Sequence, residues 1–502
     1  MSSAGGPVWG KHLAAKPAEA LVRFCSGRDV TVVPMADAEL LPYDLWTNRA
    51  HAIMLHRQGI LGREVLIGLL SALGALEADW RAGRFVLDPA REDVHSNVEA
   101  YVSQREGSEV GGRLHTGRSR NDQVVCDTRL FVREACLDLA ESLHQLMMVL
   151  LDQARLHVET VIPGFSHMQP AMVTTWAHWL CSYAQALCRD LERLRLAIDL
   201  SGRNPLGAAA GFGTSWPIDR ELTAELLAFD RVETNTLDAV GSRWELEWQV
   251  GTVYAAMMTH LSTVAQDLVQ LSHPYWGMIA LDDAYVTGSS IMPQKRNPDW
   301  AEVIRGKTAW IGGMTAGLLG VPKGGMSGYN RDTQVTKYLL LDIVRECQPA
   351  PVIVGSVIDT MTVDVEAMRV RTDQGYLAAA DFADRLAQAL ALPFRSCYDI
   401  AAVAVRYAGK SGTITQAAAV RAVEEAGHPI DPLKTILADL TDPHRVVSWR
   451  NHTGAPAPEA VRRQIESLQA ELERLTGYVG PLRKRIEAAR QRCNDYAAIE
   501  LG

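Results

Sequence analysis

Apolar residues recur at intervals of three and four along the middle of the chain. Between Cys126 and Ile162 there is neither glycine nor proline, and the apolar positions from Leu130 to Leu151 follow the helical period. A continuous helix over this stretch would be roughly 55 Å long at about 1.5 Å per residue. Similar patterns predict three more helices, at 175 to about 200, about 246 to 271, and about 333 to 347.

Strand signals are few, and "VTVV" at 30–33 is the best of them. No repeat of 20–50 residues is apparent, which favours a bundle of long helices over a solenoid. We therefore predict a mainly α fold with three domains. These are an N-terminal mixed and helical domain (1–112), a central long-helix bundle (113–372) and a small helical C-terminal domain (373–502).

Composition narrows the class of partner. The chain has 502 residues and a net charge of −9, which disfavours nucleic acid or an anionic membrane as the main partner. Its N-terminus, "MSSAGGPVWG", lacks the pattern of a secretion signal, and apolar runs such as "LMMVLL" are too short to span a bilayer, so we expect a cytoplasmic protein. Scattered cysteines and the absence of H-E-x-x-H and glycine-rich nucleotide motifs predict neither a metal nor a cofactor.

Four polar, glycine-bearing stretches interrupt or cap the long helices. Taken singly, each is typical of a loop or a helix cap. Taken together, they supply the cations, fork-shaped donors and amides that bind carboxylates. The stretches are "LHTGRSRNDQ" (114–123), "PGFSHMQPAM" (163–172), "TGSSIMPQKRNPDW" (287–300) and "KGGMSGYNRDTQ" (323–334).

The third stretch resembles a known signature. "GSSIMPQKRNP" meets every fixed position of G-S-S-x-M-P-x-K-x-N, the pattern of the aspartase/fumarase superfamily. "LHTGRSRNDQV" and "GFSHMQPA" resemble argininosuccinate lyases, with Ser166 in place of a threonine, and the similarity extends over nearly the whole chain. The resemblance implies a homotetramer with a central bundle of long helices, in which residues from three subunits build each active site.

The resemblance also implies a reaction, the cofactor-free β-elimination of an N-substituted aspartate to fumarate and an amine. Ser289 matches the base that removes the Cβ proton, and its anionic form would need local stabilisation by backbone N–H groups or cations. Lys295 and Asn297 match the residues that stabilise the resulting dianion, and His167 matches a histidine beside the leaving group. The remaining expected substrate-binding residues are Arg120, Asn121, Ser166, Ser290, Met292, Tyr329, Arg331, Gln334 and Lys337.

Several positions depart from the argininosuccinate lyase pattern. Ser242, Trp244, Val335 and Thr336 stand where that family has acidic residues, and Arg49 stands where it has an apolar residue. Losing acids disfavours a cationic guanidinium and favours an amine that itself bears a carboxylate, with Arg49 and Arg331 as candidate partners. The chain also resembles argininosuccinate-lyase-like members that cleave aminopolycarboxylates, which implies ethylenediamine-N,N′-disuccinate as substrate, giving fumarate and N-(2-aminoethyl)aspartate.

Three alternatives remain open at this point. One is a true argininosuccinate lyase. The second is a fumarase or aspartase, against which "LHTGRSRNDQV" argues. The third is an inactive structural protein of the crystallin kind, which the presence of Ser289, Lys295, Asn297 and His167 disfavours.

Overall fold

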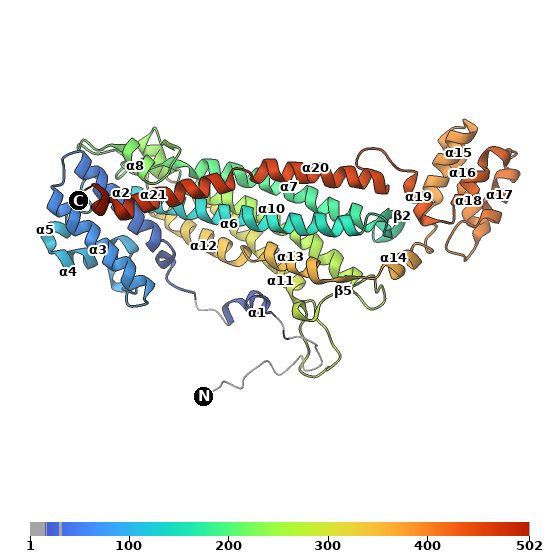
Figure 1. Ribbon diagram of the computed structural model, residues 1–502, viewed down its shortest axis with the longest axis horizontal. Helices are drawn as coiled ribbons and strands as arrows, with labels where there is room; N and C mark the ends of the chain where they lie inside the picture. The colour runs from blue at the N-terminus through green and yellow to red at the C-terminus, as the bar shows by residue number, and fades with distance from the viewer. Residues whose placement is uncertain (1–15, 17, 30–32, 501–502) are drawn as a thin grey trace.

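Long helices packed side by side form the body of the molecule (Figure 1). The computed structural model describes residues 16, 18–29 and 33–500. The mainly α prediction is confirmed. The bundle contains α6 (Arg120–Leu156), α7 (Trp176–Ser201), α10 (Arg243–Leu271), α11 (Asp299–Gly320), α12 (Gln334–Cys347), α13 (Ala350–Thr360) and α20 (Pro458–Thr476).

The 37-residue helix α6 extends along most of the bundle. It begins at Arg120 because Ser119 and Asp122 form a reciprocal capping box, in which Ser119 N donates to the Asp122 carboxylate at 3.0 Å. It ends at Leu156, so the prediction of a helix as far as Ile162 is wrong at its C-terminal end. The absence of glycine and proline permits a helix there, but the β-branched residues Val161 and Ile162 pair in a strand instead.

That strand, β1 (Val161–Ser166), forms an antiparallel hairpin with β2 (Gln169–Thr175). Ser166 pairs with Gln169, so His167 and Met168 make a two-residue turn. Both turn residues have positive φ, 52° and 62°. This is the geometry that hairpin turns usually give to Asn-Gly. The hairpin lies at one end of the bundle, next to the start of α7 (Figure 1).

Shorter helices cover the other end of the bundle, where α6 begins (Figure 1). Residues 30–32 of the predicted strand "VTVV" lie outside the described residues, and Val33 is not in a strand. No helix in the described part of the chain is long and apolar enough to cross a lipid bilayer. The covering elements are α2 (Leu41–Arg57), α3 (Arg63–Arg81), α4 (Val94–Glu106), α5 (Ser108–Gly111), α8 (Arg220–Leu226) and α9 (Thr236–Gly241).

The remaining elements are short or peripheral. Strands β3 (Arg203–Asn204) and β4 (Arg231–Val232) pair in parallel, and β5 (Ile279–Ala280) and β6 (Thr362–Val363) pair antiparallel. The other helices are α1 (Glu19–Ser26), α14 (Val365–Arg371), α15 (Ala379–Leu390), α16 (Phe394–Ala408), α17 (Gln416–Glu425), α18 (Lys434–Asp439), α19 (Pro443–Ser448) and α21 (Val479–Glu500).

The C-terminal region divides between two cores. Helices α15 to α18 enclose a core of their own around Phe382 and Leu433. Helix α20 instead returns to pack on α6 and α7, because its apolar stripe, including Ile465, Leu468 and Leu472, is buried in the bundle core. The separate core therefore stops before residue 458, short of the predicted end at 502, while the three-domain division itself stays a prediction.

This packing predicts the effect of truncating α20. Leu472 is fully buried, so Leu472→Ala should lower the free energy of unfolding of the bundle by about 2–5 kcal/mol. Leu156→Ala is the matched control, because Leu156 is 73 % exposed and its truncation should change little. Thermal and urea unfolding measure both variants. A Leu472→Ala protein whose main transition stays at the wild-type position would contradict the placement of α20 in the bundle.

Candidate active site

The loop that carries Ser289 connects β5 to α11 and projects from the flank of the bundle (Figure 1). Its base is closed by two backbone hydrogen bonds between Thr287 and Asn297, at 2.9 and 2.8 Å. The Thr287 hydroxyl also donates to Asp299 in the first turn of α11, and Arg296 forms an ion pair with Asp283. The base of the loop is therefore held firmly, while residues 290–296 at its tip are exposed.

The Ser289 hydroxyl oxygen faces two backbone donors within this loop. Ser289 Oγ accepts hydrogen bonds from the N–H groups of Ile291 at 3.3 Å and Met292 at 3.1 Å. Two donors directed at one oxygen favour its anionic form, which is what a serine needs in order to act as a base. The local stabilisation expected from the sequence is thus available from the backbone.

Neighbouring residues of the loop have different environments. Lys295 and Ser290 are exposed, and Met292 is 38 % exposed. The Asn297 side chain donates to Gly288 O at 3.4 Å, so its amide lies across the base of the loop next to Ser289. An amide beside the serine, and a lysine elsewhere in the same loop, can stabilise negative charge that develops on a bound carboxylate.

Ser166 and His167 lie at the tip of the β1–β2 hairpin, and both are exposed. Positive φ at two consecutive residues other than glycine is costly and is found mostly where function requires the side chains. The turn presents the imidazole of His167 to the surroundings at one end of the bundle.

Arg120 and Asn121 lie in the first turn of α6, at the opposite end. Arg120 contacts Asp93 at 2.8 Å and Glu92 at 3.9 Å, and Arg331 contacts the same Glu92 at 2.8 Å. The stretches 114–123 and 323–334 therefore converge on the segment that precedes α4.

Lys337 and Gln334, both on α12, have partners within the chain and are therefore less available to bind a substrate. Lys337 is buried and forms an ion pair with Asp37, so its charge is already neutralised within the chain. The Gln334 amide donates to the Tyr338 hydroxyl at 3.3 Å, and Tyr329 is half-buried. Sequence reasoning found Lys337 but gave no sign of its partner, because Asp37 lies 300 residues away.

A cavity of about 530 Å³ lies beside this second region. Its wall includes Ser242 and Trp244, two of the residues that depart from the family pattern. Three carboxylates that were not predicted as site residues also line it. The residues 235–245 and 321–333 both contribute to its lining, and the three carboxylates are those of Asp238, Glu245 and Asp332.

The other departures, at Val335, Thr336 and Arg49, do not line this cavity. Thr336 is buried, and its hydroxyl donates to Thr333 O at 2.9 Å and to Glu247 at 3.3 Å. Burial raises the pKa of Glu247 to about 7 although Arg243 opposes the shift. Arg49 is buried against Glu77 at 2.6 Å, so the expectation that it binds substrate is not supported.

The predicted residues thus form three groups that one chain does not bring together. Ser166 and His167 lie at one end of the bundle, Arg120, Asn121 and Arg331 at the other, and the Ser289 loop on the flank (Figure 1). Helix α6 alone separates the two ends by about 55 Å. Among the described residues, a buried group of Asp44, His95 and Asp127 has ligand atoms within 4.8 Å of one another, close enough for a metal ion.

Comparison with known proteins assigns the chain to a family. Residues 48–313 match the family described as "Lyase". The chain is 37 % identical to an argininosuccinate lyase of Thiobacillus denitrificans over 482 residues, covering 94 % of this chain and 100 % of that one. It is 39 % identical to that of Ralstonia nicotianae over 442 residues, covering 87 % and 93 %. The chain is an argininosuccinate lyase-like member of the aspartase/fumarase superfamily.

Solved structures agree with this membership. EDDS lyase in complex with formate superposes on this argininosuccinate lyase-like chain with a TM-score of 0.83 at 27 % identity, covering 96 % of this chain and 95 % of that one. A class II fumarase from Schistosoma mansoni has a TM-score of 0.68 at 16 % identity, covering 86 % and 95 %, which shows a shared fold. This argininosuccinate lyase-like protein is a carbon–nitrogen lyase.

The geometry at Ser289 predicts unequal roles for the two adjacent serines of this lyase. Ser289→Ala removes the oxygen that the two backbone N–H groups address, and should lower kcat by at least about 10²–10⁴-fold. Ser290→Ala removes an equivalent hydroxyl one residue away and should cost less. Fumarate absorbance measures both rates. A Ser289→Ala enzyme that keeps more than about a tenth of wild-type kcat would rule out Ser289 as the base.

Proposed function

We propose that this protein eliminates the amine from an N-substituted aspartate, reversibly and without a cofactor, to give fumarate. Ser289 Oγ takes a proton from Cβ, the electron pair forms the new carbon–carbon double bond, and the carbon–nitrogen bond breaks to release the amine, which gains a proton. The two backbone N–H groups on Ser289 Oγ are the observation that carries this proposal, since they stabilise the anion that the first step needs.

The intermediate of this reaction carries an additional negative charge that the protein must stabilise. Removing the Cβ proton places extra charge on the adjacent carboxylate, and this charge exists only after deprotonation. Asn297 lies next to Ser289 and Lys295 belongs to the same loop, which supports a role for both in lowering the barrier more than they strengthen ground-state binding. His167 lies beside the departing amine in this scheme.

We further propose that the active protein is a homotetramer whose sites draw residues from three subunits. The separation of His167 from Asn121 along α6 supports this, because one chain cannot place both on the same small substrate. Helix α11 supports it as well. Trp310 and Leu319 are 42 % and 46 % exposed on this helix. A side chain added at Gly306, Gly312 or Gly313 would meet no atom of the described residues within 4 Å, which leaves an open surface for a second copy.

For the substrate we propose ethylenediamine-N,N′-disuccinate, which would give fumarate and N-(2-aminoethyl)aspartate. Ser242 and Trp244 support this choice, because they replace acids of the family pattern at the wall of the cavity. Val335 is 44 % exposed on α12 and removes a third acid. A pocket with fewer carboxylates suits a leaving amine that carries a carboxylate of its own, and the exposed Arg331 is a partner for it.

Argininosuccinate is the second candidate, and two observations favour it. The chain is 37–39 % identical to argininosuccinate lyases but only 27 % identical to the EDDS lyase. Moreover, Asp238, Glu245 and Asp332 still contribute carboxylates to the cavity, and carboxylates suit a guanidinium.

A direct comparison of the two substrates tests the choice. We expect kcat/KM for ethylenediamine-N,N′-disuccinate to exceed that for argininosuccinate by at least about 100-fold, or about 2.7 kcal/mol of transition-state discrimination. Trp244→Asp should restore a carboxylate to the cavity wall and narrow this ratio. Equal or better activity on argininosuccinate would return the chain to the second candidate.

A further inference from the structure

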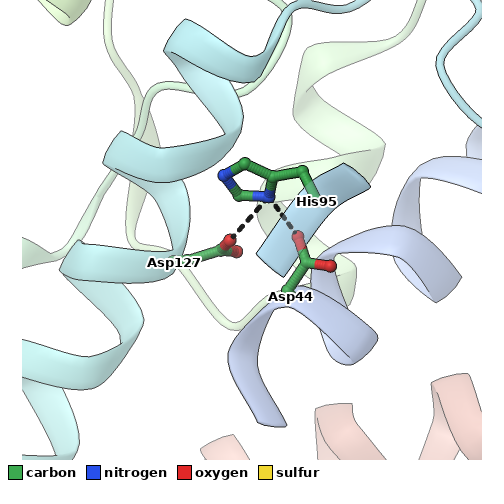
Figure 2. A group of neighbouring side chains, drawn as sticks. All are labelled: Asp44, His95 and Asp127. Atoms are coloured by element: carbon green, nitrogen blue, oxygen red, sulfur yellow. Dashed lines mark hydrogen bonds and ion pairs between the residues drawn. The ribbon is translucent and has the colours of Figure 1, made fainter. Parts of the chain in front are cut away.

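Three ionisable side chains meet in the interior below the start of α6. His95 on α4 lies between Asp44 on α2 and Asp127 on α6, with His95 Nδ1 2.7 Å from Asp44 Oδ1 and 3.8 Å from Asp127 Oδ2 (Figure 2). The two aspartates are fully buried and His95 is nearly so. Charged groups at this depth are costly unless they are paired.

The hydrogen bonds of Asp44 indicate that it is ionised. His95 Nδ1 and the Gln123 amide, at 2.5 Å, both donate to Oδ1, and the Asn48 amide donates to Oδ2 at 2.8 Å. Burial alone would raise the pKa of Asp44, but His95 and Arg118 outweigh it and hold that pKa below its ordinary value. A carboxylate with three donors has no need of a further cation.

The surroundings of Asp127 favour its protonated form, in contrast to those of Asp44. The Thr47 hydroxyl donates to Oδ1 at 2.7 Å, whereas Oδ2 is buried and accepts no hydrogen bond from the described residues. Burial and the charge of Asp44 raise the pKa of Asp127 well above its ordinary value. A proton on Asp127 explains the unpaired oxygen, since the carboxylic acid then donates toward Asp44. The cluster therefore holds protons, and a metal would have to displace the donors on Asp44.

The cluster connects to residues on both sides of Asn121, in the first turn of α6 and in the loop before it, residues 113–119. Gln123, which donates to Asp44, lies two residues after Asn121. Asn48, which also donates to Asp44, accepts a hydrogen bond from the buried guanidinium of Arg118, three residues before Asn121. Arg118 in turn donates to Leu114 O at 3.1 Å. Both sides of Asn121 are thus held through the same carboxylate.

We propose that His95 is a positioning residue, which orients Asp44 so that Gln123 and Arg118 hold Asn121 in place to bind the succinyl part of the substrate. His95 itself is buried and need not touch the substrate. The link to substrate rests on the proposed function, whereas the effect of His95 on the loop does not.

Replacing the imidazole tests this role. His95→Leu should increase deuterium exchange over residues 113–123 and raise KM for fumarate in the reverse reaction at least about fivefold, with a smaller change in kcat. His95→Asn should restore both values, because its amide can donate from nearly the position of Nδ1. His260→Leu is the matched control, since His260 Nδ1 also lies 2.7 Å from a buried carboxylate, that of Asp190, but has no contact with the loop.

Each outcome decides between the assignments. Loop exchange that rises equally in His260→Leu, or that stays unchanged in His95→Leu, overturns the positioning role. Increased exchange without a KM change leaves the loop assignment standing and overturns the role of Asn121 in the proposed function. Asp127→Asn should preserve loop protection, because its amide donates toward Asp44 as the acid does. If the purified protein contains one equivalent of metal, and Asp127→Asn lacks it, then the cluster is a metal site and Asp127 does not carry the proton assigned to it.

Discussion

The continuous hydrogen bonding of α6 makes it a rigid rod, and this rigidity fixes the distance between the two ends of the bundle. A helix of 37 residues holds its ends about 55 Å apart, and the packing of α7, α13 and α20 along it leaves no freedom to bring those ends together. Residues that bind one small substrate must lie within a few ångströms of each other. Under the proposed function, the site residues lie at both ends of this rigid chain, so each site would take its missing part from another copy.

The two ends are built by different physical means. At the hairpin, His167 and Met168 take positive φ angles at the surface, and the β1–β2 pairing keeps them in that costly conformation. At the start of α6, buried polar groups hold the loop from beneath, with Asp122 accepting backbone N–H groups of Gly207 and Ala209, both at 2.8 Å. Burial raises the pKa of Asp122 to about 6 in spite of these bonds. The Ser289 loop depends neither on a strained turn nor on buried polar groups, because backbone hydrogen bonds between Thr287 and Asn297 close its base.

Much of the bundle could be predicted from periodicity, since apolar spacing reports which face of a helix is buried. The stretches predicted near 175–200, 246–271 and 333–347 correspond to α7, α10 and α12. Periodicity did not predict the end of α6, because Val161 and Ile162 fit a helix face as well as a strand and only the pairing with β2 decides between them. It also did not predict the return of α20, which depends on packing against helices some 300 residues away in sequence.

Contacts between distant segments also limit what the sequence predicts about the site. The motif at Ser289 is local, so the sequence was sufficient to find it, and the loop's own N–H groups supply the expected stabilisation. Nothing in the sequence indicated that Arg49 and Lys337, expected to bind substrate, form ion pairs with Glu77 and Asp37, because these partners come from other segments. The cluster around His95 was missed for this reason too, since its three members are isolated residues on three helices.

Mixed oligomers test whether each site needs residues from more than one copy of the chain. Ser289→Ala and His167→Ala chains are each expected to assemble into oligomers of low activity. Co-expressed with different affinity tags and purified through both, they should form oligomers in which about a quarter of the sites contain both native residues, with a matching return of fumarate release. Mixed oligomers no more active than either parent would contradict the account and would place a complete site within one chain.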